Sequence, residues 1–282
     1  MQLTGSRSGI RAETAFAAVS VLAFVGLSSY VALVAPTPKL LGVSWVAFAA
    51  MAAGALLGSR TLSEHPRGLV WGYGLAAGAM VTSAAVFLVP QAIGASPRYG
   101  GFGIAAGLLV GFAGHTVGHR LTHLELPMDR TVAELSAHAV SAGLIIGVVY
   151  TAMPDLGPLL GVAIVSHKGP AGYAAARRLV RNGRPVAPIL LPASGVGVAA
   201  LTVSLLSVPS SATAQGVVFG FAAGIFLHVA MDFLPRCETG SEVHTHWEES
   251  GHAHEMLDRL RIHAVVSTAL GALAVYVAWV VV

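Results

Sequence analysis

Charged side chains are scarce in this sequence: Asp, Glu, Lys and Arg together make up 10% of its 282 residues. A soluble domain usually carries about 25% charged residues, because its surface must be hydrated. Apolar residues make up 55% of the chain, and the mean hydropathy is +0.74. A surface with so few charges suits lipid better than water, so we expect an integral membrane protein.

Several features of other protein classes are missing as well. The single cysteine, Cys237, excludes a disulfide framework or a thiolate cluster within one chain. The sequence lacks the period-two alternation of a membrane β-barrel, and open sheet edges cannot face lipid. It also lacks an H-E-x-x-H motif, a carboxylate pair within the membrane and a convincing Ser-His pair. We therefore expect an all-α protein that is not an enzyme and has no nucleic-acid partner.

Long apolar stretches are what the sequence has instead. A helix needs about 20 apolar residues to cross a bilayer core, and turn-forming or charged residues separate most of the stretches of that length. The nine predicted spans are 14–36, 40–59, 69–91, 102–121, 132–152, 157–180, 186–208, 213–235 and 261–282. The first follows Arg7 and Arg11, as a signal peptide would. Its apolar core of about 20 residues exceeds the 7–15 of a signal sequence, so we interpret it as a retained anchor helix.

Basic residues are divided unevenly between the two sides of the membrane. With nine spans, the N-terminal segment and the loops after every second span share one side, and most of the 16 Lys and Arg lie there. The other side holds Lys39 and Arg98, and Lys168 lies inside a span. Since cytoplasmic loops are rich in Lys and Arg, we expect a multi-pass protein of the cell membrane. Its N-terminus would be cytoplasmic and its C-terminus external.

Ionisable side chains inside the membrane are functional candidates, because each costs a few kcal/mol to place there. The candidates are His138 in the fifth span, His167 and Lys168 in the sixth, and His228 and Asp232 in the eighth. The last two are four residues apart and share a helix face. They form either a hydrogen-bonded pair at the membrane interface or an exit step for a metal.

The fifth and sixth spans share the pattern H-x-x-x-A-G, at 138–143 and 167–172. The two spans run in opposite directions, as in the inverted repeats that build transporter sites. Two imidazoles facing each other across a helix pair would suit Zn²⁺, although each histidine is equally suited to an interhelical hydrogen bond. Pro170 is expected to kink the sixth span.

Lys168 follows His167 directly, so an angular step of about 100° turns it towards a different neighbour. Two interpretations stay open for it. It is either a built-in cation that tunes a site, or a neutral lysine that is hydrogen-bonded to a carbonyl group.

At these motifs the chain resembles the ZIP family (Zrt/Irt-like proteins), which carry divalent metals into the cytoplasm. Residues 138–143, H-A-V-S-A-G, match the family's H-N-x-P-E-G in its fourth core helix, and residues 167–172, H-K-G-P-A-G, match H-E-x-P-E-G in its fifth. The eighth span, with its glycine-rich start, Asp232 and closing proline, looks like the seventh core helix. The resemblance covers about residues 40–282.

The resemblance implies an all-α integral membrane protein with an eight-helix ZIP-like bundle plus one extra N-terminal transmembrane helix. Residues 1–39 would form the N-terminal cytoplasmic segment and the extra helix, and residues 40–282 the transport domain. The partners would be membrane lipid and a divalent metal ion, with Zn²⁺ or a related metal as the substrate. A homodimer is one option for the assembly.

The family's carboxylates are missing from this chain. Ala139 stands at the Asn position, Ala142 and Ala171 stand at the two glutamate positions, and Lys168 replaces the acidic neighbour of the second histidine. The resemblance therefore leaves His138 and His167 as metal ligands, with the charge of Lys168 replacing the second metal. Such a site would bind a dication weakly, because a nearby ammonium repels it.

A histidine-rich loop follows the eighth span, with His244, His246, His252 and His254 among several glutamates. Family members often have such cytoplasmic loops that bind metal, whereas a solvated loop with incidental affinity is the alternative. Our leading hypothesis is the inward transport of a divalent metal by alternating access. The alternatives are transport of another solute on the same scaffold, and a metal sensor that transports nothing.

Overall fold

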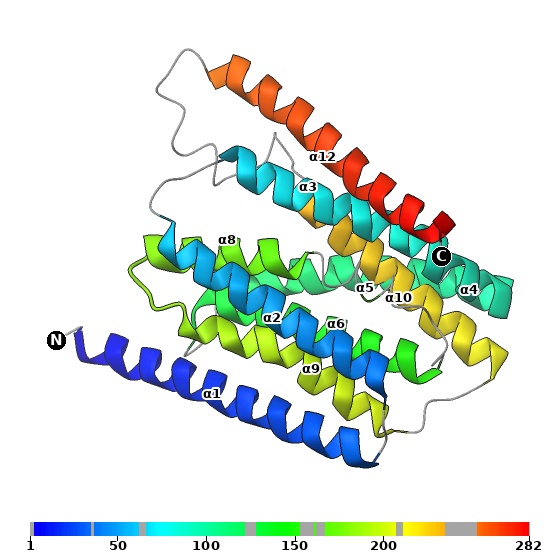
Figure 1. Ribbon diagram of the computed structural model, residues 1–282, viewed down its shortest axis with the longest axis horizontal. Helices are drawn as coiled ribbons and strands as arrows, with labels where there is room; N and C mark the ends of the chain where they lie inside the picture. Colours follow the sequence, from blue (N-terminus) through cyan, green and yellow to red (C-terminus); the bar gives the residue numbers. More distant parts are fainter. Residues whose placement is uncertain are drawn as a thin grey trace.

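The computed structural model describes residues 3–34, 37–61, 66–121, 128–152, 161, 167–206, 211–234 and 253–281 (Figure 1). Within these residues the chain forms helices and no strands, as the composition predicts. The elements are α1 (Leu3–Val34), α2 (Pro38–Arg60), α3 (Pro66–Ser83), the π-helix η1 (Ala84–Leu88), α4 (Val89–Ala95), α5 (Pro97–Leu121), α6 (Arg130–Ala152), α8 (Lys168–Arg181), the 3₁₀-helix η2 (Ala187–Ile189), α9 (Leu190–Ser204), α10 (Ala212–Phe233) and α12 (Ala253–Val281).

Seven of these helical segments are long and apolar enough to cross a membrane. The chain is therefore a multi-pass membrane protein. They are 12–34, 38–60, 70–95, 130–151, 187–204, 212–231 and 259–281. The other two predicted spans, 102–121 and 157–180, coincide with α5 and, in their described part, with α8. Because the seven do not include these two, a total of nine crossings stays a prediction.

Several helix ends follow directly from the residues found there. Pro38, Pro66 and Pro97 occupy the first positions of α2, α3 and α5, where a proline costs no intrahelical hydrogen bond. Ser211 caps α10, since its hydroxyl accepts a hydrogen bond from the backbone of the first turn. Gly183, with φ of 65°, ends α8 in the left-handed region that glycine tolerates best.

The helices pack in two groups (Figure 1). In the first group, α2 packs on α8 and α9, and α9 also packs on α1 and α6. In the second group, α10 packs on α5, α3 and α4, and α12 packs on α3. The main contacts between the groups are those of α10 with α6 and of α3 with α8. The N-terminal helix α1 therefore belongs to the first group.

Glycines let the helices within each group approach closely. A Cβ at Gly54 of α2 would overlap the carbonyl oxygen of Gly169 in α8, and one at Gly172 would overlap the carbonyl of Met51. The same type of contact joins Gly107 in α5 to α10. Lipid offers no hydrophobic driving force between helices, so such close van der Waals packing holds transmembrane helices together.

We expect Gly54→Leu to destabilise the protein, because the new side chain must push α8 away from α2. Overpacking of this kind typically costs about 1–3 kcal/mol. The measurement is the thermal unfolding temperature in detergent. Gly42→Leu is the matched control, because Gly42 lies on the same helix and a Cβ there meets nothing within 4 Å. Equal unfolding temperatures for the two variants would contradict the close contact.

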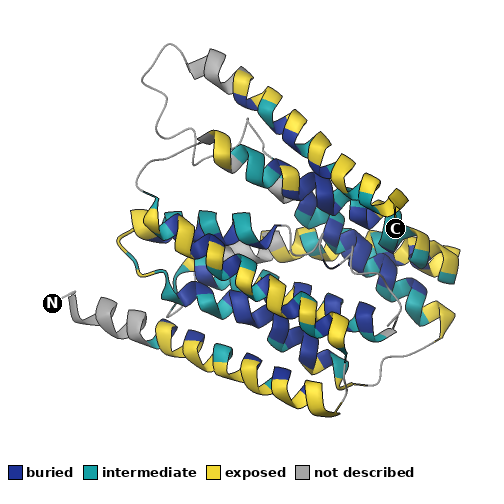
Figure 2. Cartoon of the chain, viewed as in Figure 1, coloured by how far each residue is buried: buried dark blue, intermediate teal, exposed yellow. Residues whose placement is uncertain are grey.

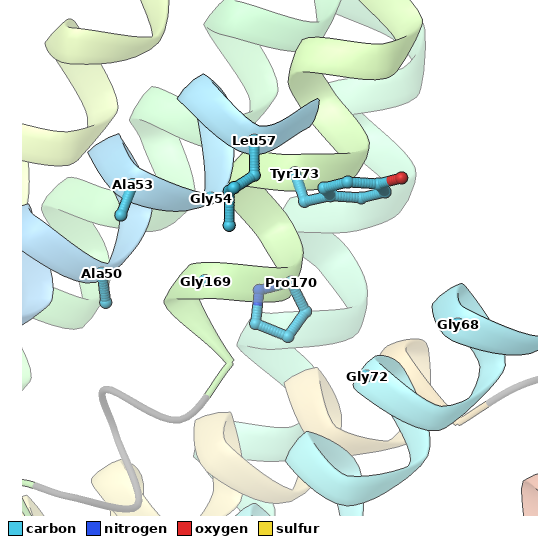
Figure 3. Close-up of a pocket in the computed structure, with 9 residues that line it drawn as sticks. All are labelled: Ala50, Ala53, Gly54, Leu57, Gly68, Gly72, Gly169, Pro170 and Tyr173. Atoms are coloured by element: carbon cyan, nitrogen blue, oxygen red, sulfur yellow. The ribbon is translucent and has the colours of Figure 1, made fainter. Parts of the chain in front are cut away.

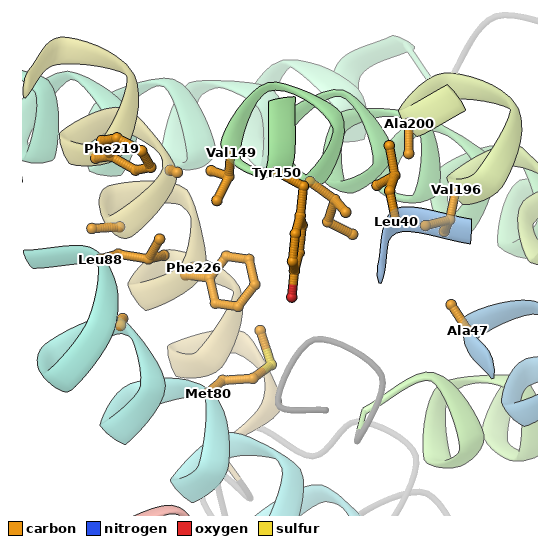
Figure 4. Packing of buried hydrophobic residues seen from close by; sticks show 14 of the residues in the cluster. Leu40, Ala47, Met80, Leu88, Val149, Tyr150, Val196, Ala200, Phe219 and Phe226 are labelled. Atoms are coloured by element: carbon orange, nitrogen blue, oxygen red, sulfur yellow. The ribbon is translucent and has the colours of Figure 1, made fainter. Parts of the chain in front are cut away.

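A hydrophobic cluster connects the two groups (Figure 4). Phe219 and Phe226 of α10 and Met80 of α3 come from the second group, and Val149 and Tyr150 of α6 come from the first. The outward faces of the peripheral helices α1 and α12 are largely exposed (Figure 2). These faces are apolar, with Leu33 85% exposed, as expected for helices that face lipid.

Candidate substrate site between helices α6 and α8

His138 of α6 and His167 at the N-cap of α8 lie close together. Their ring centroids are 5.8 Å apart and the rings are inclined by 68°. His167 is buried, and His138 Nε2 is also shielded from solvent. The pairing of these two imidazoles, which the repeated H-x-x-x-A-G pattern predicts, is therefore confirmed. Their role as metal ligands stays a prediction.

Lys168 belongs to the same cluster. It follows His167 directly in the chain, and its side chain is fully buried. His167 is the N-cap residue of α8, and Lys168 is the first residue of that helix. The direction of the Lys168 side chain relative to His167, and its role as a cation or as a neutral amine, stay predictions.

The first turn of α8 is held against α2 by the glycine contacts described above. Pro170 lies in this first turn. Its position inside the predicted sixth span indicates instead a kink within a longer helix. The first N–H groups of a helix have no intrahelical partner, so a proline costs little there. The residues H-K-G-P-A-G thus place Lys168 at the helix start and bring the backbones of α8 and α2 together.

Acidic side chains are missing from this cluster among the residues that the structure describes. No Asp, Glu or Cys in the described segments joins the two histidines in a group of three possible metal ligands. The acidic side chains described are Glu13, Asp129 and Glu134, and each pairs with an arginine. Among the described residues, the cluster therefore consists of two imidazoles and one lysine side chain.

Of the other predicted site residues, His228 is the one whose side chain the structure describes. His228 of α10 packs against Gly111 of α5, where a Cβ would approach its imidazole at 2.6 Å. The helix α10 includes Asp232, but its side chain lies outside what the structure describes, as does that of His254 in α12. The loop residues His244, His246 and His252 also lie outside the described residues.

One buried acidic residue was not among the sequence candidates. Glu13 of α1 is 2% exposed, and its Oε1 accepts hydrogen bonds from the Arg184 guanidinium at 2.7 Å and the Asp129 backbone N–H at 2.6 Å. These contacts connect α1 to the start of α6 and to the chain that follows α8. An acidic residue beside the boundary of the first predicted span was the signal that could have revealed it.

A pocket of about 460 Å³ lies next to the cluster, between α2, α3 and α8 (Figure 3). Gly169 and Pro170, which directly follow Lys168, line it together with Ala53 and Gly54 of α2 and Gly72 of α3. The pocket therefore lies between α2 and α8 of the first helix group and α3 of the second. Most of the side chains that line it are small and apolar.

The chain matches no model of a known protein family and no curated protein. The residues and geometry of the cluster are therefore the basis for a proposed function.

Proposed function

We propose that the protein carries a divalent transition metal, with Zn²⁺ as the first candidate, across the cell membrane into the cytoplasm. The observation that carries this proposal is the pairing of His138 with His167 at 5.8 Å between ring centroids. Neutral imidazole is a preferred ligand of Zn²⁺, Cu²⁺ and Ni²⁺. Ionisable groups within a membrane protein commonly line the path of a transported ion.

The packing of the two helix groups supports alternating access. In many transporters, one helix bundle moves against another around a central site. With the predicted topology, the hydrophobic cluster of Phe219, Met80 and Tyr150 joins the groups in the outer half of the membrane. The pocket beside Gly72 lies between the groups in the cytoplasmic half. This arrangement corresponds to a state that is closed on the outside and more open on the inside.

The ZIP-like assignment is part of the same proposal. It rests on the two H-x-x-x-A-G motifs at 138–143 and 167–172 and on the glycine-rich α10. In this proposal, α2 to α12 form the eight-helix transport domain, and α1 is an added helix. His228 and Asp232 would lie on the cytoplasmic exit path, and the loop histidines would accept the metal.

Uptake of radiolabelled Zn²⁺ into proteoliposomes tests the proposed function. We expect saturable uptake that exceeds that of empty liposomes, and competition by other divalent transition metals. Uptake at the rate of empty liposomes for Zn²⁺, Mn²⁺, Fe²⁺, Co²⁺ and Ni²⁺ would contradict the proposal.

A further inference from the structure

The buried side chain of Lys168 lacks an acidic partner in the part of the chain that the structure describes. Lys168 is 0% exposed, and its Nζ has no hydrogen-bond partner among the described residues. A charged group removed from water costs several kcal/mol unless it is paired and hydrogen-bonded. The described acidic side chains cannot supply the pairing, because Glu13, Asp129 and Glu134 are bound to arginines elsewhere.

Two further features point to the sign of the missing partner. The helix α8 begins at Lys168 and runs for 14 residues. Its first N–H groups have no intrahelical acceptors, and its N-terminus carries a partial positive charge that favours anions. His138 adds a ring nitrogen, since its Nε2 is buried and has no hydrogen-bond partner among the described residues. In the tautomer that carries the proton on Nε2, the imidazole can donate a hydrogen bond to an anion as well as to an acceptor in the protein.

We infer that a small anion binds in this cluster, between the Lys168 ammonium, the start of α8 and the His138 ring. The ligand class is a halide or a small carboxylate or oxyanion, because the site offers one lysine amine, which is positively charged when protonated, and a few further donors. The inference concerns the same site as the proposed function and deepens it. The anion would offset the repulsion between Lys168 and a dication, and would stand where Ala139, Ala142 and Ala171 provide no carboxylate.

Thermal unfolding of the purified protein in detergent with a chelator tests this inference without any metal. Sodium gluconate, whose anion is larger than those of the proposed ligand class, sets the reference at constant ionic strength. Chloride, nitrate, formate, acetate, bicarbonate and sulfate then replace gluconate one at a time. We expect a saturable rise of several degrees in unfolding temperature for at least one small anion, because a ligand that binds only the folded state stabilises it.

Lys168→Met should remove this response and still fold, because an apolar side chain of similar length replaces a buried charge. Lys39→Met is the matched control, since Lys39 is exposed at the start of α2, and it should respond as the unaltered protein does. Lack of any anion effect beyond gluconate, or an equal effect in Lys168→Met, would overturn the inference.

A third variant tests whether the chain itself supplies the anion. Asp155 lies outside the described residues and precedes α8 in the sequence. If only the Asp155→Asn variant responds to added anions, an internal carboxylate occupies the site and the inference is wrong. A response of equal size with and without Asp155 supports an external anion.

The outcome is independent of metal transport. An anion response without Zn²⁺ uptake would uphold this site and reject the proposed function, whereas uptake that proceeds in gluconate with no anion response would do the reverse.

Discussion

Metal uptake is expected to fall to the level of empty liposomes in the double variant His138→Ala/His167→Ala. The two imidazoles are the only His, Cys, Asp or Glu side chains that the described residues bring together at this depth of α6 and α8. Even the loss of a group that only orients a metal ligand typically costs 10–100-fold in metal affinity or activity. Removal of both ligands should therefore lower uptake by about 100-fold or more.

The measurement is the initial rate of radiolabelled Zn²⁺ uptake in proteoliposomes with equal amounts of inserted protein. His263→Ala is the control, because His263 is hydrogen-bonded to Trp71 between α3 and α12 and takes no part in the cluster. It should keep the rate of the unaltered protein. Both variants need unfolding temperatures close to that of the unaltered protein, so that a loss of uptake reports on the site. A double variant that transports normally would remove the proposed metal site.

The second large effect is expected at Lys168. We expect Lys168→Glu to bind Zn²⁺ at least tenfold more tightly than the unaltered protein does. The substitution replaces a side chain that is positively charged when protonated with a carboxylate, at the position directly after His167. At about 5 Å and an effective dielectric constant of about 20, one unit charge acts on another with roughly 3 kcal/mol, so even a strongly screened change exceeds a tenfold effect.

Isothermal titration calorimetry in gluconate buffer measures this affinity in the absence of small anions. Lys168→Gln separates the two contributions, since it removes the charge without adding a carboxylate and should give an intermediate affinity. Lys39→Glu makes the same change at an exposed site and should leave the affinity unchanged. Zn²⁺ affinity that is lower in Lys168→Glu than in Lys168→Gln would show that the lysine does not adjoin the metal site.

The two effects concern different charges of one cluster. The histidine variant removes ligands from a metal, whereas the lysine variant changes the sign of the potential in which the metal is bound. A protein with the proposed anion site should lose its anion response in Lys168→Glu as its affinity for Zn²⁺ rises. The opposite changes in the two affinities would distinguish a local charge effect from general damage to the fold.

The membrane character of the chain and most of its helices could be predicted from the sequence. Long apolar stretches must form helices in lipid, because every backbone polar group needs a partner within the chain. The proximity of His138 and His167 could also be predicted, since the two motifs recur on neighbouring spans of opposite direction. The count of nine spans stays a prediction. The two spans that correspond to α5 and α8 contain glycines and charged residues, which lower their apolar content.

Other properties of the site depend on contacts between segments that are distant in the sequence. Hydropathy along the chain measures how strongly each segment prefers lipid to water. This preference is sufficient to predict the helices and their location in the membrane. It contains no information on where α8 starts relative to α2, which depends on the contact of Gly54 with Gly169. That start places Lys168 and Pro170 in the first turn of a helix, and the packing of α1 on α9 buries Glu13 beside Arg184 and Asp129. Close packing acts between atoms and not along the sequence, so these placements emerged only when the helices were assembled.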